Sequence, residues 1–270
     1  VDMMLSEFID DLRQTSVVMN QEFHKYIKGK KLVGFIVLMI AIIAGIYLIF
    51  TLSEIKFPSE SKDFITLYLR FITILAIVAV TIFSSGLLVS EYEERTGLLL
   101  FTRPIKKESI FAGKFLAGFI TSTFVIIIYY VIVAIMSYII TGSIYGKIWV
   151  SLGLMIAYIF GATGIALLFS SYFKKSNTAT SVTIIVLLIV GNWISQLFSG
   201  NGIEPWFSIT YSSGSIITVL NGASAALMYD DAIRSSWYYV ADPALSAMVM
   251  VTWGVFVSFI ASLIYKQRGF

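Results

Sequence analysis

The sequence predicts an all-α membrane protein with six transmembrane helices. Of its 270 residues, 58% are hydrophobic and 13% are charged, whereas soluble domains have roughly 45 to 50% apolar residues. The mean hydropathy is +0.87. Six apolar runs each approach the roughly 20 residues that a helix needs to cross a bilayer. They are residues 32–53, 64–90, 115–141, 148–171, 181–198 and 244–265. We therefore expect a six-span domain over residues 32–270.

The N-terminal segment, residues 1–31, has the pattern of an amphipathic helix. Its apolar residues recur close to helical spacing, with charged residues between them. The segment ends in a basic cluster of Lys28, Lys30 and Lys31. These features are typical of a helix that lies along the cytoplasmic surface of a membrane. A partly disordered tail is the alternative.

The distribution of positive charge predicts the orientation. An even number of spans places both termini on one side, and lysine and arginine are enriched on the cytoplasmic side of membrane proteins. The ends and loops assigned to that side carry Arg13, Lys25, Lys28, Lys30, Lys31, Arg95, Arg103, Lys106, Lys107, Lys114, Lys174, Lys175, Lys266 and Arg268. The opposite side carries only Lys56, Lys62, Lys147 and Arg234. We expect both termini in the cytoplasm, the lipid bilayer of the cell membrane as surroundings, and no nucleic-acid partner.

The stretch between the second and third runs is the most strongly charged part of the chain. A charged residue at mid-bilayer costs roughly 2.5 to 3.5 kcal/mol, so we expect this stretch to lie in water. Gly97 suits the end of the preceding helix. Pro104 suits the first turn of a new one, where its missing N–H is harmless. The expected arrangement is a helix, a break, a short surface helix and the next span.

Within this stretch, a pattern of acidic, glycine, leucine, proline, basic and aliphatic residues runs through Glu91, Glu94, Thr96, Gly97, Leu99, Leu100, Pro104, Ile105, Lys106, Ile110, Gly113 and Lys114. This pattern resembles the cytoplasmic linker of the type-2 permease family of ATP-binding-cassette (ABC) exporters. Thr96 precedes Gly97 here, whereas the family more often has the reverse order. The resemblance implies that residues 91–114 form a coupling linker that docks on a separate ATP-binding subunit.

The resemblance also assigns candidate contacts with that subunit. They are Glu91, Glu94, Arg95, Arg103, Pro104, Ile105 and Lys107, with Lys174 and Lys175 of the second cytoplasmic loop as auxiliary contacts. As an alternative, Glu91, Glu94 and Arg95 brace the linker against neighbouring helices.

Three polar residues within the spans are candidates for a substrate pathway. Arg70 lies about two turns from the outer end of the second run. We favour an anchor at the interface, or pairing with an acidic residue of the outer loop, over a role in guiding substrate. Asn192 and Gln196 are one turn apart on the fifth run, and hydrogen bonding between helices is the equal alternative.

Small residues form two stripes that allow close helix packing, either within the chain or between two copies. The first stripe comprises Gly153, Ala157, Gly161 and Gly164, and the second comprises Gly113, Ala117 and Thr121. We favour packing within one chain.

The extracytoplasmic segment 199–243 is too long for a simple connection. It is too apolar for a free loop and too interrupted by glycine and serine for a span. We expect short re-entrant or interfacial helices there, with a plain extracellular cap as the alternative.

The sequence carries no catalytic or metal-binding motif. It has no G-x-x-x-x-G-K-[ST] phosphate-binding loop, no cysteine, and His24 as its only histidine. ATP and Mg²⁺ would therefore be bound by the partner ATPase and not by this chain. We expect a non-catalytic exporter permease that pairs with a second permease subunit, as a homodimer or heterodimer. The alternative is a membrane anchor or mechanical transmitter that acts on an extracytoplasmic partner without moving a solute.

Overall fold

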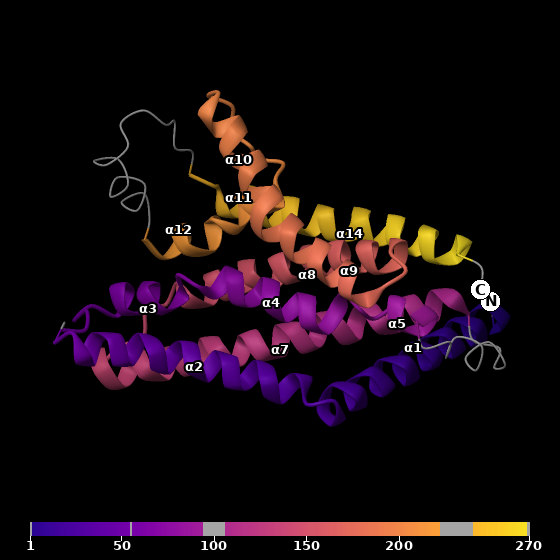
Figure 1. Ribbon diagram of the computed structural model, residues 1–270, viewed down its shortest axis with the longest axis horizontal. Helices are drawn as coiled ribbons and strands as arrows, with labels where there is room; N and C mark the ends of the chain where they lie inside the picture. The colour runs from indigo at the N-terminus through magenta and orange to yellow at the C-terminus, as the bar shows by residue number, and fades with distance from the viewer. Residues whose placement is uncertain (1, 55, 94–105, 222–239, 269–270) are drawn as a thin grey trace.

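The computed structural model describes residues 2–54, 56–93, 106–221 and 240–268, and throughout these ranges the regular structure is helical, without strands. Figure 1 shows the arrangement. The helices are α1 (Asp2–Lys28), α2 (Lys31–Leu52), α3 (Ser61–Leu69), α4 (Ile72–Ser84), α5 (Val89–Glu93), α7 (Lys107–Thr141), α8 (Ile148–Tyr172), α9 (Ser176–Ile185), η1 (Val186–Val190), α10 (Gly191–Gly200), α11 (Ile209–Ser213), α12 (Ser215–Asn221) and α14 (Pro243–Gln267).

Six helical stretches within these ranges are long and apolar enough to cross a membrane. They are Lys31–Leu52, Ser61–Glu91, Lys107–Thr141, Ile148–Tyr172, Ser176–Gly200 and Pro243–Gln267. The predicted all-α membrane fold with six spans is confirmed. Both termini lie at the same end of the bundle (Figure 1).

The second and fourth spans form the centre of the bundle. Both are mostly buried, whereas the first and fifth spans expose most of their apolar surface to the surroundings of the chain. The second span consists of three pieces, α3, α4 and α5, because the helix is interrupted after Leu69 and after Ser84. Figure 1 shows α4 running between α7 and α8.

The third span begins earlier than expected. The helix α7 starts at Lys107, eight residues before the predicted start at residue 115. Residues 107–114 are therefore the first turns of a span and not a separate part of the linker. The reason is that α1 packs on these turns: a Cβ atom on Gly113 would lie 2.8 Å from the Thr15 carbonyl oxygen of α1. The side chain of Ile110 is buried accordingly.

Glycines of α8 and α14 bring these two helices into close contact. A Cβ atom on Gly161 would lie 2.8 Å from the Met250 carbonyl oxygen, and one on Gly254 would lie 3.3 Å from the Cα atom of Gly161. Gly164 likewise faces Gly254. Packing within one chain is thus the role of Gly161 and Gly164, whereas a Cβ atom on Gly153 would have no described atom within 4 Å.

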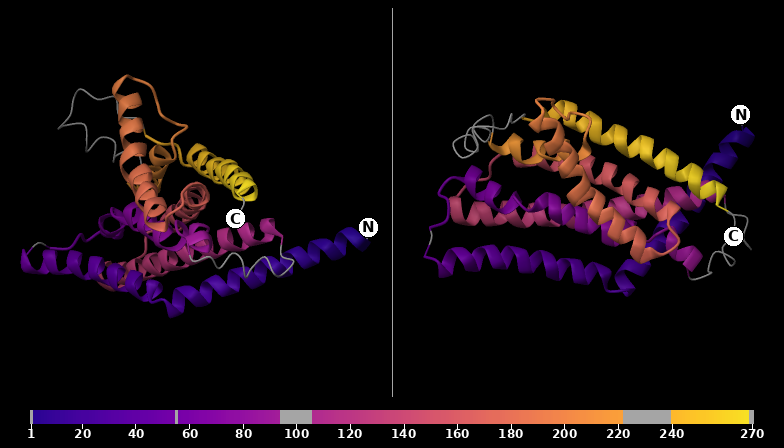
Figure 2. Two further views of the ribbon diagram at one scale, coloured as in Figure 1. Left: turned by 45° about the vertical axis from the view of Figure 1, so that its right-hand side comes forward. Right: turned by 45° about the horizontal axis from the view of Figure 1, so that its top comes forward.

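The fifth span is interrupted by the π-helical segment η1, and α10 then leaves the bundle obliquely (Figure 2). Two short helices, α11 and α12, follow it. Ser208 caps α11 by accepting a hydrogen bond from the Tyr211 N–H at 3.4 Å, and Ile216 and Leu220 of α12 are fully buried. The short helices expected before the last span are present, and the remainder of that segment, residues 222–239, lies outside the described residues.

The α8–α14 contact predicts unequal tolerance of two glycines on one helix. Gly161→Leu should lower the thermal midpoint of the detergent-solubilised protein by several degrees, because overpacking costs about 1 to 3 kcal/mol. Gly153→Leu is the matched control and should shift the midpoint by no more than a degree or two. Differential scanning fluorimetry measures both, and equal shifts would contradict the assignment.

Candidate coupling site

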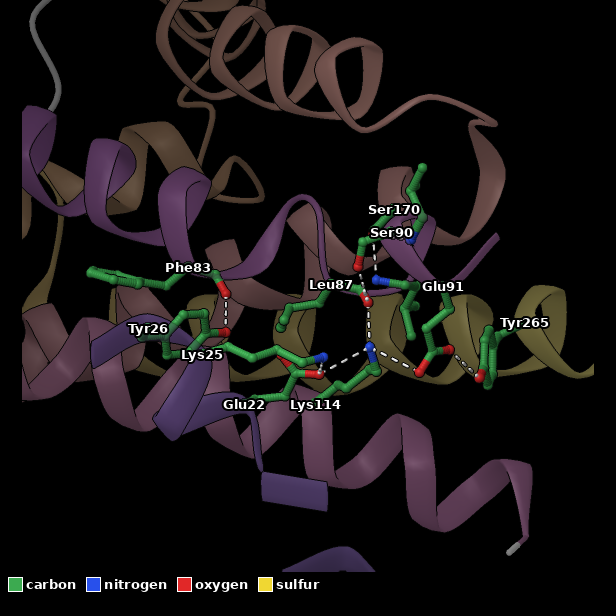
Figure 3. Close-up of polar contacts among 12 residues, drawn as sticks. Glu22, Lys25, Tyr26, Phe83, Leu87, Ser90, Glu91, Lys114, Ser170 and Tyr265 are labelled. Atoms are coloured by element: carbon green, nitrogen blue, oxygen red, sulfur yellow. Dashed lines mark hydrogen bonds and ion pairs between the residues drawn. The ribbon is translucent and has the colours of Figure 1, made fainter. Parts of the chain in front are cut away.

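A buried lysine connects three segments at the end of the bundle that carries the termini. The Lys114 side chain is only 1% exposed, and its Nζ lies 3.0 Å from Oε1 of Glu91 on α5. It also lies 3.3 Å from Oε1 of Glu22 on α1 and donates a hydrogen bond to the carbonyl oxygen of Leu87. Figure 3 shows these contacts converging on the ammonium group. One cation therefore holds together α1, the end of the second span and the start of the third.

Two further side chains, the exposed Lys25 and the buried Tyr265, complete the cluster. Lys25 Nζ lies 2.9 Å from the same Glu22 oxygen that faces Lys114. The Tyr265 hydroxyl of α14 donates a hydrogen bond to Glu91 Oε2 at 3.0 Å. The cluster therefore extends to the last span (Figure 3). It contains two carboxylates and two ammonium groups and is neutral as a whole.

Neutrality and hydrogen bonding make this burial tolerable. An unpaired ion loses several kcal/mol of hydration when it is buried, and removing one partner of a buried pair costs about 3 to 5 kcal/mol. Burial by itself raises the pKa of the Glu22 carboxyl, but the positive charges of Lys114 and Lys25 outweigh that effect, so this pKa lies below its ordinary value. Glu22 is therefore a carboxylate at neutral pH.

Contacts with α1 and α8 set the position of the turn between α4 and α5. The backbone N–H groups of Leu88 and Val89 donate to Oγ of Ser170 on α8, at 3.0 and 3.3 Å. The Tyr26 hydroxyl donates to the carbonyl oxygen of Phe83 at the end of α4. These bonds hold α5 in the orientation that directs Glu91 inward.

The far end of α5 contacts the turn between α8 and α9. Glu93 Oε2 accepts a hydrogen bond from the backbone N–H of Ser176 at 3.2 Å. This turn carries Lys174 and Lys175, whose side chains are exposed. The two auxiliary candidates therefore lie next to the residues that precede the linker.

Residues that follow the linker are attached to α1. Lys106 Nζ lies 2.9 Å from Asp11 Oδ2, and the Lys106 backbone N–H donates to Gln14 Oε1 at 3.3 Å. Both contacts are solvent-exposed, so each adds at most about 1 kcal/mol.

The same residues contact the C-terminal end of α14. Lys107 Nζ donates to the carbonyl oxygens of Lys266 and Arg268, at 3.3 and 3.2 Å. Glu108 forms an ion pair with Lys266 at 2.7 Å. Segment 94–105 is consequently flanked on both sides by residues that bind α1 or α14.

Comparison with known proteins identifies the family. A model of the family described as ABC-2 family transporter protein matches residues 16–264. The chain belongs to the ABC-2 transporter family. It is a membrane-embedded permease component of an ABC transporter, and its partner is an ATP-binding subunit. No curated protein matches the chain.

The permease departs from one expectation of the sequence. Glu91 and Lys114 do not lie in water: they are 4% and 1% exposed. The expectation rested on the free-energy cost of placing a charge in lipid. Here each ion lies inside the protein, next to opposite charges from neighbouring helices. The contacts of Glu91 with Lys114 and Tyr265 favour the alternative interpretation, in which Glu91 braces the linker against neighbouring helices.

Sequence reasoning missed Glu22 and Tyr265 as members of the cluster. Glu22 lies one turn from Val18 and one turn from Tyr26, on the buried stripe of α1. A carboxylate within an apolar stripe is a signal that the sequence did contain. Tyr265 gave no comparable signal, because a tyrosine near the end of a span is common at membrane interfaces.

Several candidate coupling residues of the permease fall outside the described residues. They are Glu94, Arg95, Arg103, Pro104 and Ile105. Lys107 is described, at the start of α7. The Arg268 Nη1 atom also donates to the Ser171 carbonyl oxygen at 2.8 Å, which joins the end of α14 to the turn that carries the auxiliary candidates.

The three candidate pathway residues are all exposed on the surface of the single chain. Arg70 lies at the break between α3 and α4. Asn192 donates to the Leu188 carbonyl oxygen one turn earlier, at 2.7 Å, and Gln196 follows one turn later. Among the described residues, no group of three or more His, Cys, Asp or Glu side chains is arranged to hold a metal ion.

The buried cluster predicts a large difference between two lysines. Lys114→Met removes the cation between two buried carboxylates, and the free energy of unfolding should fall by about 3 to 5 kcal/mol. Lys106→Met is the matched control, because it removes an exposed ion pair worth at most about 1 kcal/mol. Denaturant titration in detergent measures both changes. A Lys114→Met effect no larger than that of Lys106→Met would refute the structural role of the cluster.

The lowered pKa of Glu22 predicts a loss of stability in acid. A group whose folded-state pKa is depressed stabilises the fold above its unfolded pKa, near 4.5, and this contribution is lost as the pH falls through the folded value. Below about pH 4.5, the free energy of unfolding should therefore fall less steeply with pH in Glu22→Gln than in the wild type. Gln21→Ala, which removes an exposed uncharged side chain of the same helix, is the control and should leave the slope unchanged. Thermal midpoints between pH 3 and pH 7 test this.

Proposed function

We propose that this permease is the transmembrane subunit of an ABC exporter. It moves a substrate out across the cytoplasmic membrane, both of its termini lie in the cytoplasm, and a separate subunit binds the ATP and Mg²⁺. One observation carries the proposal: the residues on either side of segment 94–105 contact both ends of the chain and the buried Lys114 cluster.

The geometry supports transmission of force from this segment into the bundle. Glu91 precedes the segment and Lys114 follows it, and their ion pair joins the second and third spans. A displacement of the segment therefore moves the two spans together. Glu22 and Tyr265 extend the same connection to α1 and α14.

The required driving force is within the reach of a docked partner. Shifting a two-state equilibrium from 1:99 to 99:1 takes about 5.5 kcal/mol of differential affinity. Closure of the ATP-binding subunits would supply it if they bind the two states of the permease unequally. The proposed contacts are Glu94, Arg95, Arg103, Pro104, Ile105 and Lys107, with Lys174 and Lys175 beside them; Glu91 acts as a brace.

The proposed exporter contains a second permease subunit, either a second copy or a homologous chain. The exposure of Arg70, Asn192 and Gln196 on the single chain supports this arrangement. Polar side chains that face away from one subunit can line a pathway only where another subunit covers them. The substrate pathway would therefore lie between the two permeases.

Charged substitutions at the centre of the linker test the proposal. The double variant Pro104→Asp/Ile105→Asp should reduce copurification of the ATP-binding subunit from native membranes by at least about tenfold, as expected when a central interface contact is lost. Ile144→Asp, at the connection between α7 and α8, is the control and should retain the partner. The amount of inserted permease should be equal in all three proteins.

Two outcomes count against the exporter. If the double variant copurifies as much ATP-binding subunit as the wild type, the assignment of Pro104 and Ile105 as coupling contacts is wrong. Capture of an ATPase together with an extracytoplasmic protein, but with no small molecule and no solute flux in reconstituted vesicles, would favour a mechanical transmitter.

A further inference from the structure

The helix α1 presents a strip of apolar side chains that the rest of the chain does not cover. Ile9, Leu12 and Ile27 are 56%, 54% and 63% exposed. Together with Ser16 and the partly buried Phe23, they recur at spacings of three, four and seven residues, so they lie along one flank of the helix. Figure 2 shows the N-terminal part of α1 projecting beyond the bundle.

The other two faces of α1 differ from this strip. One carries Thr15, Val18, Glu22 and Tyr26, and it packs on α7 and the end of α4. The other flank is exposed and mostly polar, with Val17 as an exposed apolar residue among its polar side chains. It carries Arg13, Gln21, His24 and Lys28. A helix with one protein-facing, one apolar and one polar face suits the boundary between lipid and water, where each face meets a matching medium.

Three lysines gather where α1 turns into α2. Lys28 ends α1, Lys30 has a left-handed backbone with φ of 57°, and Lys31 begins the first span. All three side chains are exposed. Among the residues that the structure describes, none of the three forms an ion pair, whereas the neighbouring Lys25 is neutralised by Glu22. We name these three residues the basic elbow.

The position of the basic elbow limits what can neutralise it. Because α2 enters the apolar phase directly after Lys31, the three ammonium groups lie at the depth of the lipid headgroups. The apolar strip, which ends at Ile27, is continuous with this point. Phosphate groups of lipids are the anions present at that depth, and each basic residue near an anionic surface gains a factor of about five in affinity.

We propose that the basic elbow binds the headgroup phosphates of anionic phospholipids while the apolar strip of α1 lies among the upper acyl chains. The bound lipids would anchor α1 to one leaflet. Because Glu22 on the adjacent face of α1 holds Lys114, this anchor also fixes the buried cluster relative to the membrane. The inference concerns lipid binding alone and does not depend on the proposed export function.

The absence of cysteine from the chain allows a direct test with single fluorophores. Ile27→Cys and Gln21→Cys are labelled with bimane, and the full-length protein is reconstituted in nanodiscs of phosphatidylcholine with phosphatidylglycerol. Brominated acyl chains should quench the label at position 27 and spare the one at position 21, whereas iodide should do the reverse. Similar quenching of both positions by iodide would overturn the membrane location of the strip.

The lipid class is tested by brominating either phosphatidylglycerol or phosphatidylcholine in the same mixture. Quenching at position 27 should favour phosphatidylglycerol by at least about fivefold. The triple variant Lys28→Gln/Lys30→Gln/Lys31→Gln should abolish the preference. The control Lys56→Gln/Lys62→Gln/Lys147→Gln removes the same charge from other parts of the chain and should retain it.

A salt titration of the unaltered elbow gives an independent measurement. The preference should fall as the ionic strength rises from 0.05 to 0.5 M, because screening weakens headgroup binding. The proposal is refuted if quenching at position 27 shows no preference for phosphatidylglycerol. It is also refuted if the preference persists in the triple variant or does not change with ionic strength. The proposal is also refuted if position 27 is protected from iodide only when the ATP-binding subunit is added, because a protein would then cover the strip.

Discussion

The architecture of this permease depends on how one buried ammonium group is neutralised. Lys114 lies inside the protein, and burying a lone cation would cost several kcal/mol. Glu22 and Glu91 prevent that cost, and they come from segments far apart in the sequence. The N-terminal helix, the end of the second span and the start of the third are therefore held in one arrangement by a requirement for charge balance.

The contacts around this cluster differ in strength according to their exposure. The buried ion pairs of Lys114 resist separation, whereas the ion pairs of Lys106 and Lys266 are solvent-exposed and individually weak. In the proposed coupling role, firmly held residues next to the linker, with weaker attachments around them, would transmit its displacement to the two spans. The close approach at Gly161 and Gly254 gives the last span a similarly firm attachment on the other side of the bundle.

Much of the fold followed from the sequence. Long apolar runs specify membrane helices because the hydrocarbon core offers no hydrogen-bond partners, so the backbone groups must bond to one another. The six spans and the short helices before the last one were therefore predictable. The family pattern predicted a coupling linker at residues 91–114, and Lys114 belonged to that pattern. Glu22 was also detectable, as a carboxylate on the apolar stripe of a helix.

By itself, the sequence determined which segments are helical and apolar, since that depends on local composition and length. Only the tertiary structure decided which charges meet. It buried Glu91 and Lys114 instead of leaving them in water, extended the third span to Lys107, and brought Tyr265 to the cluster. The physical reason is that the cost of a buried charge depends on neighbours distant in sequence, and one chain of residue letters does not specify their positions.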